Sequence, residues 1–173
     1  MNAHMQESVF AFEATNIVGE HVPFSSFMGR PMLVVNTASA CGFTPQLAGL
    51  ESLHRQFRNR GLIVLGFPCN QFGAQDSGSN ASISTFCTTN FGVSFAMMSK
   101  VAVKGLDAHP LFKWLTARAP GLFGTQSIKW NFTKFLIDGT GREVHRFGPA
   151  TKPASLIVPI DRLLVAAQGA MTV

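Results

Sequence analysis

Tyrosine is absent from the 173-residue sequence, cysteine occurs three times, and charged residues make up only 13%. The low charge accompanies a hydrophobic content of 46%, and this balance excludes an intrinsically disordered chain. A chain of this length buries a core without disulfide crosslinks. We therefore expect a single folded domain that spans residues 1–173.

Long apolar runs and targeting signals are also missing. The longest apolar stretches are LIVLGF (62–67) and SLIVPIDRLLVAA (155–167), and the second contains charged residues. Both fall short of a membrane span, so we expect none. The first residues show no basic segment followed by an apolar one, which predicts no secretory signal and a cytoplasmic protein.

Clusters of positive charge are missing as well, although the formal net charge is +5. The basic residues are scattered rather than interleaved with aromatic residues, which argues against a nucleic-acid partner. Neither GxGxxG nor GxxxxGK[ST] occurs, so no phosphate-binding loop is expected. The histidines are not paired at metal-ligand spacing, and we predict no metal site.

The three cysteines are Cys41, Cys69 and Cys87, and no CxxC motif joins them. This absence argues against a zinc ribbon and against a thioredoxin-type dithiol. An odd number of cysteines in a cytoplasmic chain indicates free thiols, of which one could be reactive.

Hydrophobic patterning predicts an alternation of strands and helices. Strands are expected at residues 31–38, 62–68, 131–138 and 143–148, an N-terminal hairpin at 8–15 and 20–24, and an extended segment at 97–103. Helices are expected at 45–59, from Asn80 as N-cap, at 109–119, and from about 151 to 167.

This order places a strand–helix–strand crossover before a closing hairpin and helix. A crossover implies parallel pairing, whereas the hairpin adds antiparallel strands. The sequence therefore predicts an α/β protein with a central mixed sheet flanked by helices, a thioredoxin-like arrangement.

Cys41 lies between a predicted strand and a predicted helix, in NTASACGFTPQ (36–46). Backbone N–H groups at a helix start carry partial positive charge, and they stabilise a thiolate placed near them. Gly42 leaves the approach of a substrate open. The alternative is that Cys41 is a small buried hydrophobic residue, as free cysteines often are.

Two polar segments could complete a site with Cys41. Gln75, in the Gly-rich loop NQFGAQD, carries an amide that donates to an anion without neutralising it. Trp130 and Asn131, in KWNF, place two further N–H donors next to a strand, where α/β proteins tend to bind ligands. Loop polarity and core packing are the alternatives.

Together, VVNTASACGFTPQ, GFPCNQFGAQDSG and IKWNFTKFLIDGTG resemble the glutathione peroxidase family, in the same order and over nearly the whole chain. The resemblance implies a thioredoxin fold and the reduction of hydrogen peroxide and organic hydroperoxides. It implies that Cys41 is the peroxidatic cysteine of a selenium-free thiol peroxidase. Gln75, Trp130 and Asn131 match the family's other catalytic positions.

The resemblance also implies that glutathione or thioredoxin is the reductant and that no other cofactor is needed. Cys87 lies in the helix where thioredoxin-dependent members carry a resolving cysteine, although its spacing to Phe91 differs and simple packing is the alternative. The short segment from Lys113 to Lys129 favours a monomer. The rival functions are a general thiol–disulfide oxidoreductase and a metal-binding module.

Overall fold

The computed structural model describes residues 8–172, and part of the segment on which the absence of a secretory signal was judged lies outside them. Two sheets are present in the described residues. The helices are α1 (Gln46–Phe57), α2 (Asn80–Phe91), α3 (Pro110–Arg118) and α4 (Ile157–Met171). The strands are β1 (Glu13–Thr15), β2 (His21–Pro23), β3 (Met32–Thr37), β4 (Ile63–Pro68), β5 (Ala96–Met97), β6 (Lys134–Ile137) and β7 (Val144–Phe147).

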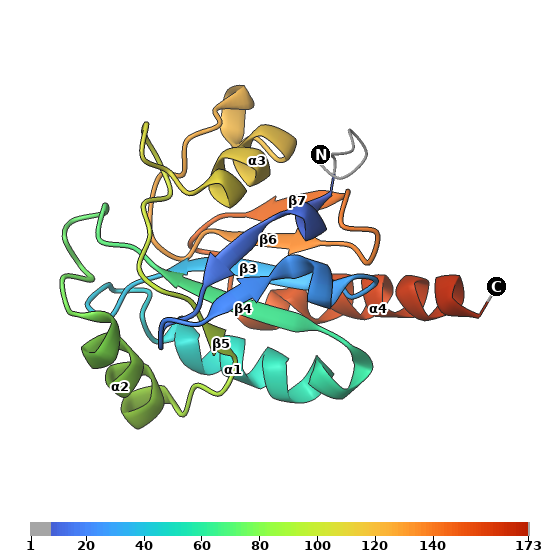
Figure 1. The fold of residues 1–173 in the computed structure, drawn as a ribbon, viewed down its shortest axis with the longest axis horizontal. Helices are drawn as coiled ribbons and strands as arrows, with labels where there is room; N and C mark the ends of the chain where they lie inside the picture. Colours follow the sequence, from blue (N-terminus) through green and yellow to red (C-terminus); the bar gives the residue numbers. More distant parts are fainter. Residues whose placement is uncertain (1–7, 173) are drawn as a thin grey trace.

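The central sheet has the strand order β5-β4-β3-β6-β7 (Figure 1). β3 pairs in parallel with β4 and antiparallel with β6, while β7 pairs antiparallel with β6. β1 and β2 form a separate antiparallel hairpin. The predicted thioredoxin-like mixed sheet with an N-terminal hairpin is therefore confirmed.

Alternating residues of β3 point into two separate cores. Leu33 and Val35 pack into a cluster with the buried faces of α1 and α4, whereas Met32 and Val34 pack into a cluster with α3 and the N-terminal segment. Figure 1 accordingly shows α1 and α4 on one side of the sheet and α3 on the other. Because all six residues of β3 are buried, its carboxyl end is fixed on both faces.

Several predicted boundaries are wrong. Val9–Ala11, expected as part of a strand, forms a 3-10 turn in which the Phe10 backbone N–H donates to Ser8 Oγ. The N-cap of α2 is Ser79 rather than Asn80, because the Ser79 hydroxyl accepts the backbone N–H of Ser82. The extended segment expected at 97–103 is wrong, because the strand after α2 is the two-residue β5, which overlaps that segment only at Met97.

The last helix is longer than expected. A 3-10 turn at Pro153–Leu156 runs into α4, which continues to Met171. The segment Pro153–Met171 has a mean hydropathy of 1.3, and only 17% of its apolar stretch is buried in the fold. By length and composition alone, this segment is therefore long and apolar enough to cross a membrane. The expectation that no stretch reaches that length therefore fails, but a single such helix is weak evidence for a membrane span.

Candidate active site

Cys41 lies in a tight turn between the end of β3 and the start of α1. Thr44 fixes this turn, because its hydroxyl donates to the Ala38 carbonyl at 2.8 Å and accepts the Cys41 backbone N–H at 2.9 Å. The backbone N–H of Phe43 points at Cys41 Sγ, 3.4 Å away. The helix proper begins only at Gln46, so this turn N–H, and not the first turn of α1, faces the sulfur.

Gln75 and Asn131 are in direct contact although they are far apart in the sequence. The Asn131 side-chain amide donates to Gln75 Oε1 at 3.0 Å, which leaves the Nε2 donor of Gln75 available to another group. The Gln75 carbonyl accepts the backbone N–H of Ala40, the residue before Cys41, at 2.9 Å. The loop after β4, the segment before β6 and the Cys41 turn therefore meet at one point.

Trp130 lies against both core clusters, and its ring packs on Phe72 with centroids 5.9 Å apart. Asn36, buried at the end of β3, holds the segment that carries Trp130. Its side-chain amide donates to the Trp130 carbonyl and its Oδ1 accepts the Thr133 backbone N–H. The position of Trp130 and Asn131 therefore depends on a polar residue inside the central strand.

Backbone strain accompanies both of these segments. Among residues 8–172, the non-glycine residues with positive φ are Ala74 (φ 52°), Phe123 (φ 56°) and Phe132 (φ 63°). Ala74 precedes Gln75 and Phe132 follows Asn131. Such conformations cost on the order of 1–3 kcal/mol each and persist where the surroundings enforce them, most often at functional sites.

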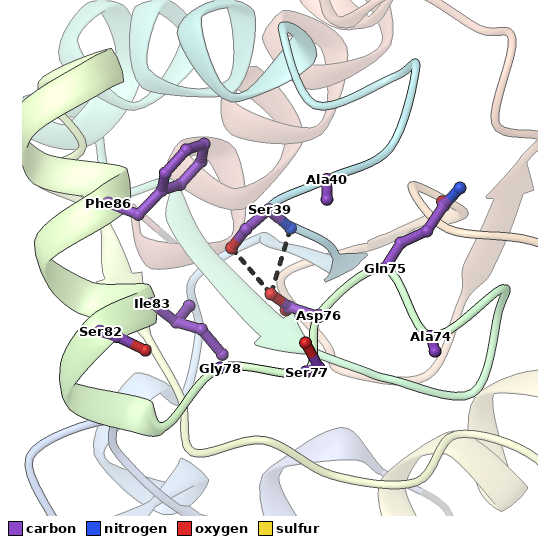
Figure 2. Close-up of a pocket in the computed structure, with 10 residues that line it drawn as sticks. All are labelled: Ser39, Ala40, Ala74, Gln75, Asp76, Ser77, Gly78, Ser82, Ile83 and Phe86. Atoms are coloured by element: carbon purple, nitrogen blue, oxygen red, sulfur yellow. Dashed lines mark hydrogen bonds between the residues drawn. The ribbon is translucent and has the colours of Figure 1, made fainter.

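Asp76 joins the Gln75 loop to the Cys41 loop. Its Oδ1 accepts both the backbone N–H and the hydroxyl of Ser39, at 3.1 and 2.7 Å (Figure 2). Burial raises the pKa of the Asp76 carboxyl, and its Oδ2 has no hydrogen-bond partner among the described residues. A small cavity of about 260 Å³ lies beside it. Figure 2 shows Ile83 and Phe86 of α2 among the residues that line this cavity.

All three cysteines are buried free thiols. Cys87 of α2 lies in the same core cluster as Cys41. Burial, with a smaller contribution from the Asp76 carboxylate, raises the pKa of the Cys87 thiol to about 11. Cys69 belongs to the opposite cluster, and burial raises the pKa of its thiol as well.

Sequence reasoning overlooked four residues that position this site, namely Asn36, Ser39, Thr44 and Asp76. A polar residue inside the apolar run PMLVVN was the available signal for Asn36. Among the described residues, no three His, Cys, Asp or Glu side chains come together as a metal site would require.

Comparison with known proteins supplies the family. The family model described as glutathione peroxidase matches residues 9–116. The chain is 48% identical to the hydroperoxy fatty acid reductase gpx1 of Synechocystis sp., over 95% of this chain and 100% of that protein. The chain belongs to the glutathione peroxidase family. It is accordingly a thiol peroxidase that reduces hydroperoxides, as the three sequence motifs predicted.

Other members of the family agree with this placement. A glutathione peroxidase of Lactococcus lactis is 50% identical over 90% of this chain and 98% of its own length. The glutathione peroxidase-like peroxiredoxin 2 of Saccharomyces cerevisiae is 44% identical over 92% of this chain and 99% of its own.

Solved structures agree with the fold. The crystal structure of Trgpx in its apo form has a TM-score of 0.76 and 39% identity to this chain, and the match covers 91% of this chain and 95% of that one. A thioredoxin-family thiol:disulfide interchange protein of Chlorobium tepidum, at 15% identity, 88% and 92% coverage and a TM-score of 0.67, shares the fold alone.

Proposed function

We propose that Cys41 is the peroxidatic cysteine of this peroxidase and that Gln75, Trp130 and Asn131 complete its catalytic site. The observation that carries the proposal is the junction of three segments. The Asn131–Gln75 hydrogen bond joins two of them, and the Gln75 carbonyl bonds to the residue before Cys41. The Phe43 N–H, 3.4 Å from the sulfur, adds a hydrogen-bond donor at the reacting atom.

The chemistry is a two-electron oxidation of sulfur. The Cys41 thiolate attacks the distal peroxide oxygen, an S–O bond forms and the O–O bond breaks. The leaving oxygen takes a proton and departs as water or an alcohol, and Cys41 becomes a sulfenic acid. The free Nε2 donor of Gln75 and the indole N–H of Trp130 are available to the negative charge that develops on the departing oxygen.

Asn131 acts by orienting Gln75. Its amide group occupies Gln75 Oε1, so Gln75 presents Nε2, a donor, instead of its oxygen. Asn131 is fully buried, and Asn36 holds the residues on both sides of it through the Trp130 carbonyl and the Thr133 backbone N–H, so this orientation is set before substrate arrives. A preorganised donor is more effective than one that must reorient during the reaction.

Cys87 is the proposed resolving cysteine. Its thiolate attacks the sulfenic sulfur of Cys41, the S–O bond breaks, the departing hydroxide takes up the proton that the thiol released and leaves as water, and a disulfide forms. Burial opposes this step in the folded structure, because it raises the pKa of Cys87 to about 11. We therefore propose that α2 opens locally before the disulfide forms. Ile83 and Cys87 are its only buried residues, and Phe86 and Phe91 pack against the core while partly exposed, so the apolar contacts of four side chains oppose opening.

The reductant follows from the fate of Cys41. If the disulfide forms, a dithiol such as thioredoxin is the donor; if the sulfenic acid persists, glutathione resolves it. We propose a cytoplasmic monomer that accepts hydrogen peroxide and organic hydroperoxides. The name of the Synechocystis relative suggests fatty-acid hydroperoxides among the substrates.

Intact mass after one equivalent of hydrogen peroxide tests these assignments. Wild type should lose two hydrogens, Cys87→Ser should gain one oxygen at Cys41, and Cys41→Ser should remain unchanged. A wild type that gains one oxygen and keeps its other thiols would indicate a one-cysteine enzyme that uses glutathione. An unmodified Cys41 in the folded, reduced protein would refute its role as the peroxidatic residue.

A further inference from the structure

A larger cavity lies beside the segment that carries Trp130. Its volume is about 960 Å³, within the range of small-molecule binding sites. It is bounded by the loop after α3, by the residues that flank Trp130 and Asn131, and by the end of β7. The lining residues are Pro120, Gly121, Leu122, Phe123, Thr125, Lys129, Thr133, Arg146, Gly148 and Pro149.

The rim of this cavity is an ordered turn that exposes two large apolar side chains. Leu122 is 83% exposed and Phe123 is fully exposed. The Gly121 N–H donates to the Thr125 carbonyl, and both the N–H and the hydroxyl of Thr125 donate to the Leu122 carbonyl. The turn is thus closed by hydrogen bonds rather than by burial of its apolar residues.

Phe123 is also the third strained residue of the described chain, with φ of 56°. The other two flank Gln75 and Asn131. A bulky side chain rarely occupies this region of φ, and no burial compensates Phe123 for doing so. Because strained residues cluster at functional sites, this strain without burial indicates that the exposed ring of Phe123 has a functional role.

The lining of the cavity is also basic. Lys129 and Arg146 are the only ionisable residues among those that line it. Arg146 also ties the loop to β7, because its guanidinium donates to the carbonyls of Gln126 and Ser127. The Lys129 ammonium is exposed and has no partner within the part of the chain that the structure describes. The cavity therefore combines an apolar rim with uncompensated positive charge.

Two connections place this cavity next to the proposed site. Lys129 immediately precedes Trp130 in the chain. In addition, the carbonyl of Pro149, which lines the cavity, accepts a hydrogen bond from the side-chain amide of Gln46. Gln46 is the first residue of α1, just after the Cys41 turn. The cavity of Figure 2 is smaller and contains the carboxyl group of Asp76, which suits a fatty-acid carboxylate less well.

We propose that this cavity is an acyl subsite that binds the chain and carboxylate of a free fatty-acid hydroperoxide while its peroxide group reaches Cys41. Leu122 and Phe123 contact the hydrocarbon chain, and Lys129 and Arg146 attract the carboxylate. This inference rests on the proposed role of Cys41, and it adds a reason for the enzyme to distinguish long-chain hydroperoxides from hydrogen peroxide.

The test uses the reduced full-length protein in single-turnover mixing with hydrogen peroxide or with a hydroperoxide of linoleic acid. Rapid-quench mass spectrometry gives the rate constant for Cys41 oxidation by each. The readout is the ratio of the two constants. Phe123→Gly should lower the ratio of linoleate hydroperoxide to hydrogen peroxide about tenfold, corresponding to the loss of about 1.4 kcal/mol of binding.

The Phe123→Gly variant also controls for folding. Glycine adopts positive φ freely, so this substitution should leave the melting temperature unchanged or higher. Leu106→Ser is a matched control, because Leu106 is 96% exposed and does not line the cavity, and its ratio should equal that of wild type.

Lys129→Gln tests the carboxylate contact. It should lower the ratio about threefold at low salt and less at high salt, because exposed charges are screened. With the methyl ester of the same hydroperoxide, which has no charge, the effect should vanish. Arg58→Gln, at an exposed cation in the turn after α1, should have no effect on the ratio.

Unchanged ratios in Phe123→Gly and Lys129→Gln would overturn the acyl subsite while leaving Cys41 in place. A loss confined to the same hydroperoxide esterified in anionic phospholipid vesicles would also overturn it, because the turn would then dock on a lipid surface. Failure of the proposed role of Cys41 is separate, since wild type would then leave Cys41 unoxidised by both peroxides.

Discussion

The two cysteines on the α1 side of the sheet lie in regions of opposite character. Hydrogen bonds hold the Cys41 turn in place. The Thr44 side chain bridges the backbone of Ala38 and Cys41. Backbone N–H groups just before Cys41 donate to the Gln75 carbonyl and to the Asp76 carboxylate of the loop after β4. The helix that carries Cys87 has only two buried residues among twelve. The first region is held by polar contacts to several segments, and the second by the apolar contacts of Ile83, Cys87 and the partly buried Phe86 and Phe91 and by its ends.

The ends of α2 are nevertheless well anchored. The Ser79 hydroxyl caps its start, and the Lys100 ammonium donates to the Gly78 carbonyl just before it. Beyond its end, the buried Glu51 carboxylate of α1 accepts the backbone N–H groups of Ser94 and Phe95. A nucleophile needs a fixed position, whereas a resolving thiol must travel. We infer that the anchored ends let α2 open without loosening the rest of the fold.

The largest contrast should come from the cysteines themselves. Cys41→Ser removes the nucleophile and should lower the rate of peroxide reduction at least about 10⁴-fold, as expected when a covalent catalyst is lost. Cys87→Ser should leave the first oxidation of Cys41 within about twofold of wild type, because it alters only the later step. The rate constant is measured in single-turnover mixing with peroxide. A similar loss of rate in both variants would contradict the assignment of different roles to the two cysteines.

The next effect concerns the amide pair. Gln75→Ala and Asn131→Ala should each slow Cys41 oxidation by about 10²-fold, the usual effect of losing a preorganised donor. Because Asn131 acts through Gln75, the double variant should be little slower than either single one. Asn90→Ala is a matched control, since Asn90 is exposed on α2 and bonds only to the Phe86 carbonyl. Additive losses would contradict the orienting role of Asn131.

A smaller effect is expected at the cap of α2. Ser79→Ala should destabilise the helix by about 1 kcal/mol and speed disulfide formation by about fivefold, because opening becomes more frequent. Ser52→Ala, on the exposed face of α1, should leave that rate unchanged. Disulfide formation is followed by trapping free thiols after one equivalent of peroxide. A slower rate in Ser79→Ala would mean that an intact α2 is required.

The smallest expected effect is the pH dependence conferred by Glu51. Burial alone would raise the pKa of this carboxyl, but the hydrogen bonds from Arg55, Ser94 and Phe95 outweigh it and lower the pKa below its usual 4.5. A lowered carboxyl pKa gives stability that is present above the unfolded pKa and is lost as pH falls through the folded pKa. The free energy of unfolding should therefore fall below pH 4.5.

Glu51→Gln should flatten this acid dependence, and the exposed Glu143→Gln should preserve it. Urea unfolding at pH 3 to 7 measures both. Equal slopes in wild type and Glu51→Gln would show that Glu51 does not hold the segment after α2 as a carboxylate.

Much of the fold could be predicted because the central strands are buried on both faces. β3 and β4 appear in the sequence as continuous apolar runs, and Gly61, at φ 109°, marks the end of the segment between them. The antiparallel pairing of β3 with β6 joins residues about a hundred positions apart, and no local pattern encodes it. The cap of α2 was misplaced because Ser79 and Asn80 are both good capping residues.

The site was predictable in its residue types but not in its contacts. The motifs singled out Gln75 and Asn131, yet the hydrogen bond between them depends on the pairing of distant segments. The positive φ values of Ala74, Phe123 and Phe132 could not be predicted from the sequence, because glycine is the residue that normally occupies such positions. The buried contacts of Asp76 were likewise invisible, since acidic residues in loops are usually exposed.

Peptide-resolved hydrogen exchange on the reduced protein would test the contrast between the two regions most directly. Backbone amides of α2 should exchange through local opening, at a free energy well below that of global unfolding and independent of low denaturant. Amides of β3 and of the Cys41 turn should exchange only near the global value. Equal protection of α2 and the Cys41 turn would contradict the account, because Cys87 would then have no route to Cys41 short of unfolding the protein.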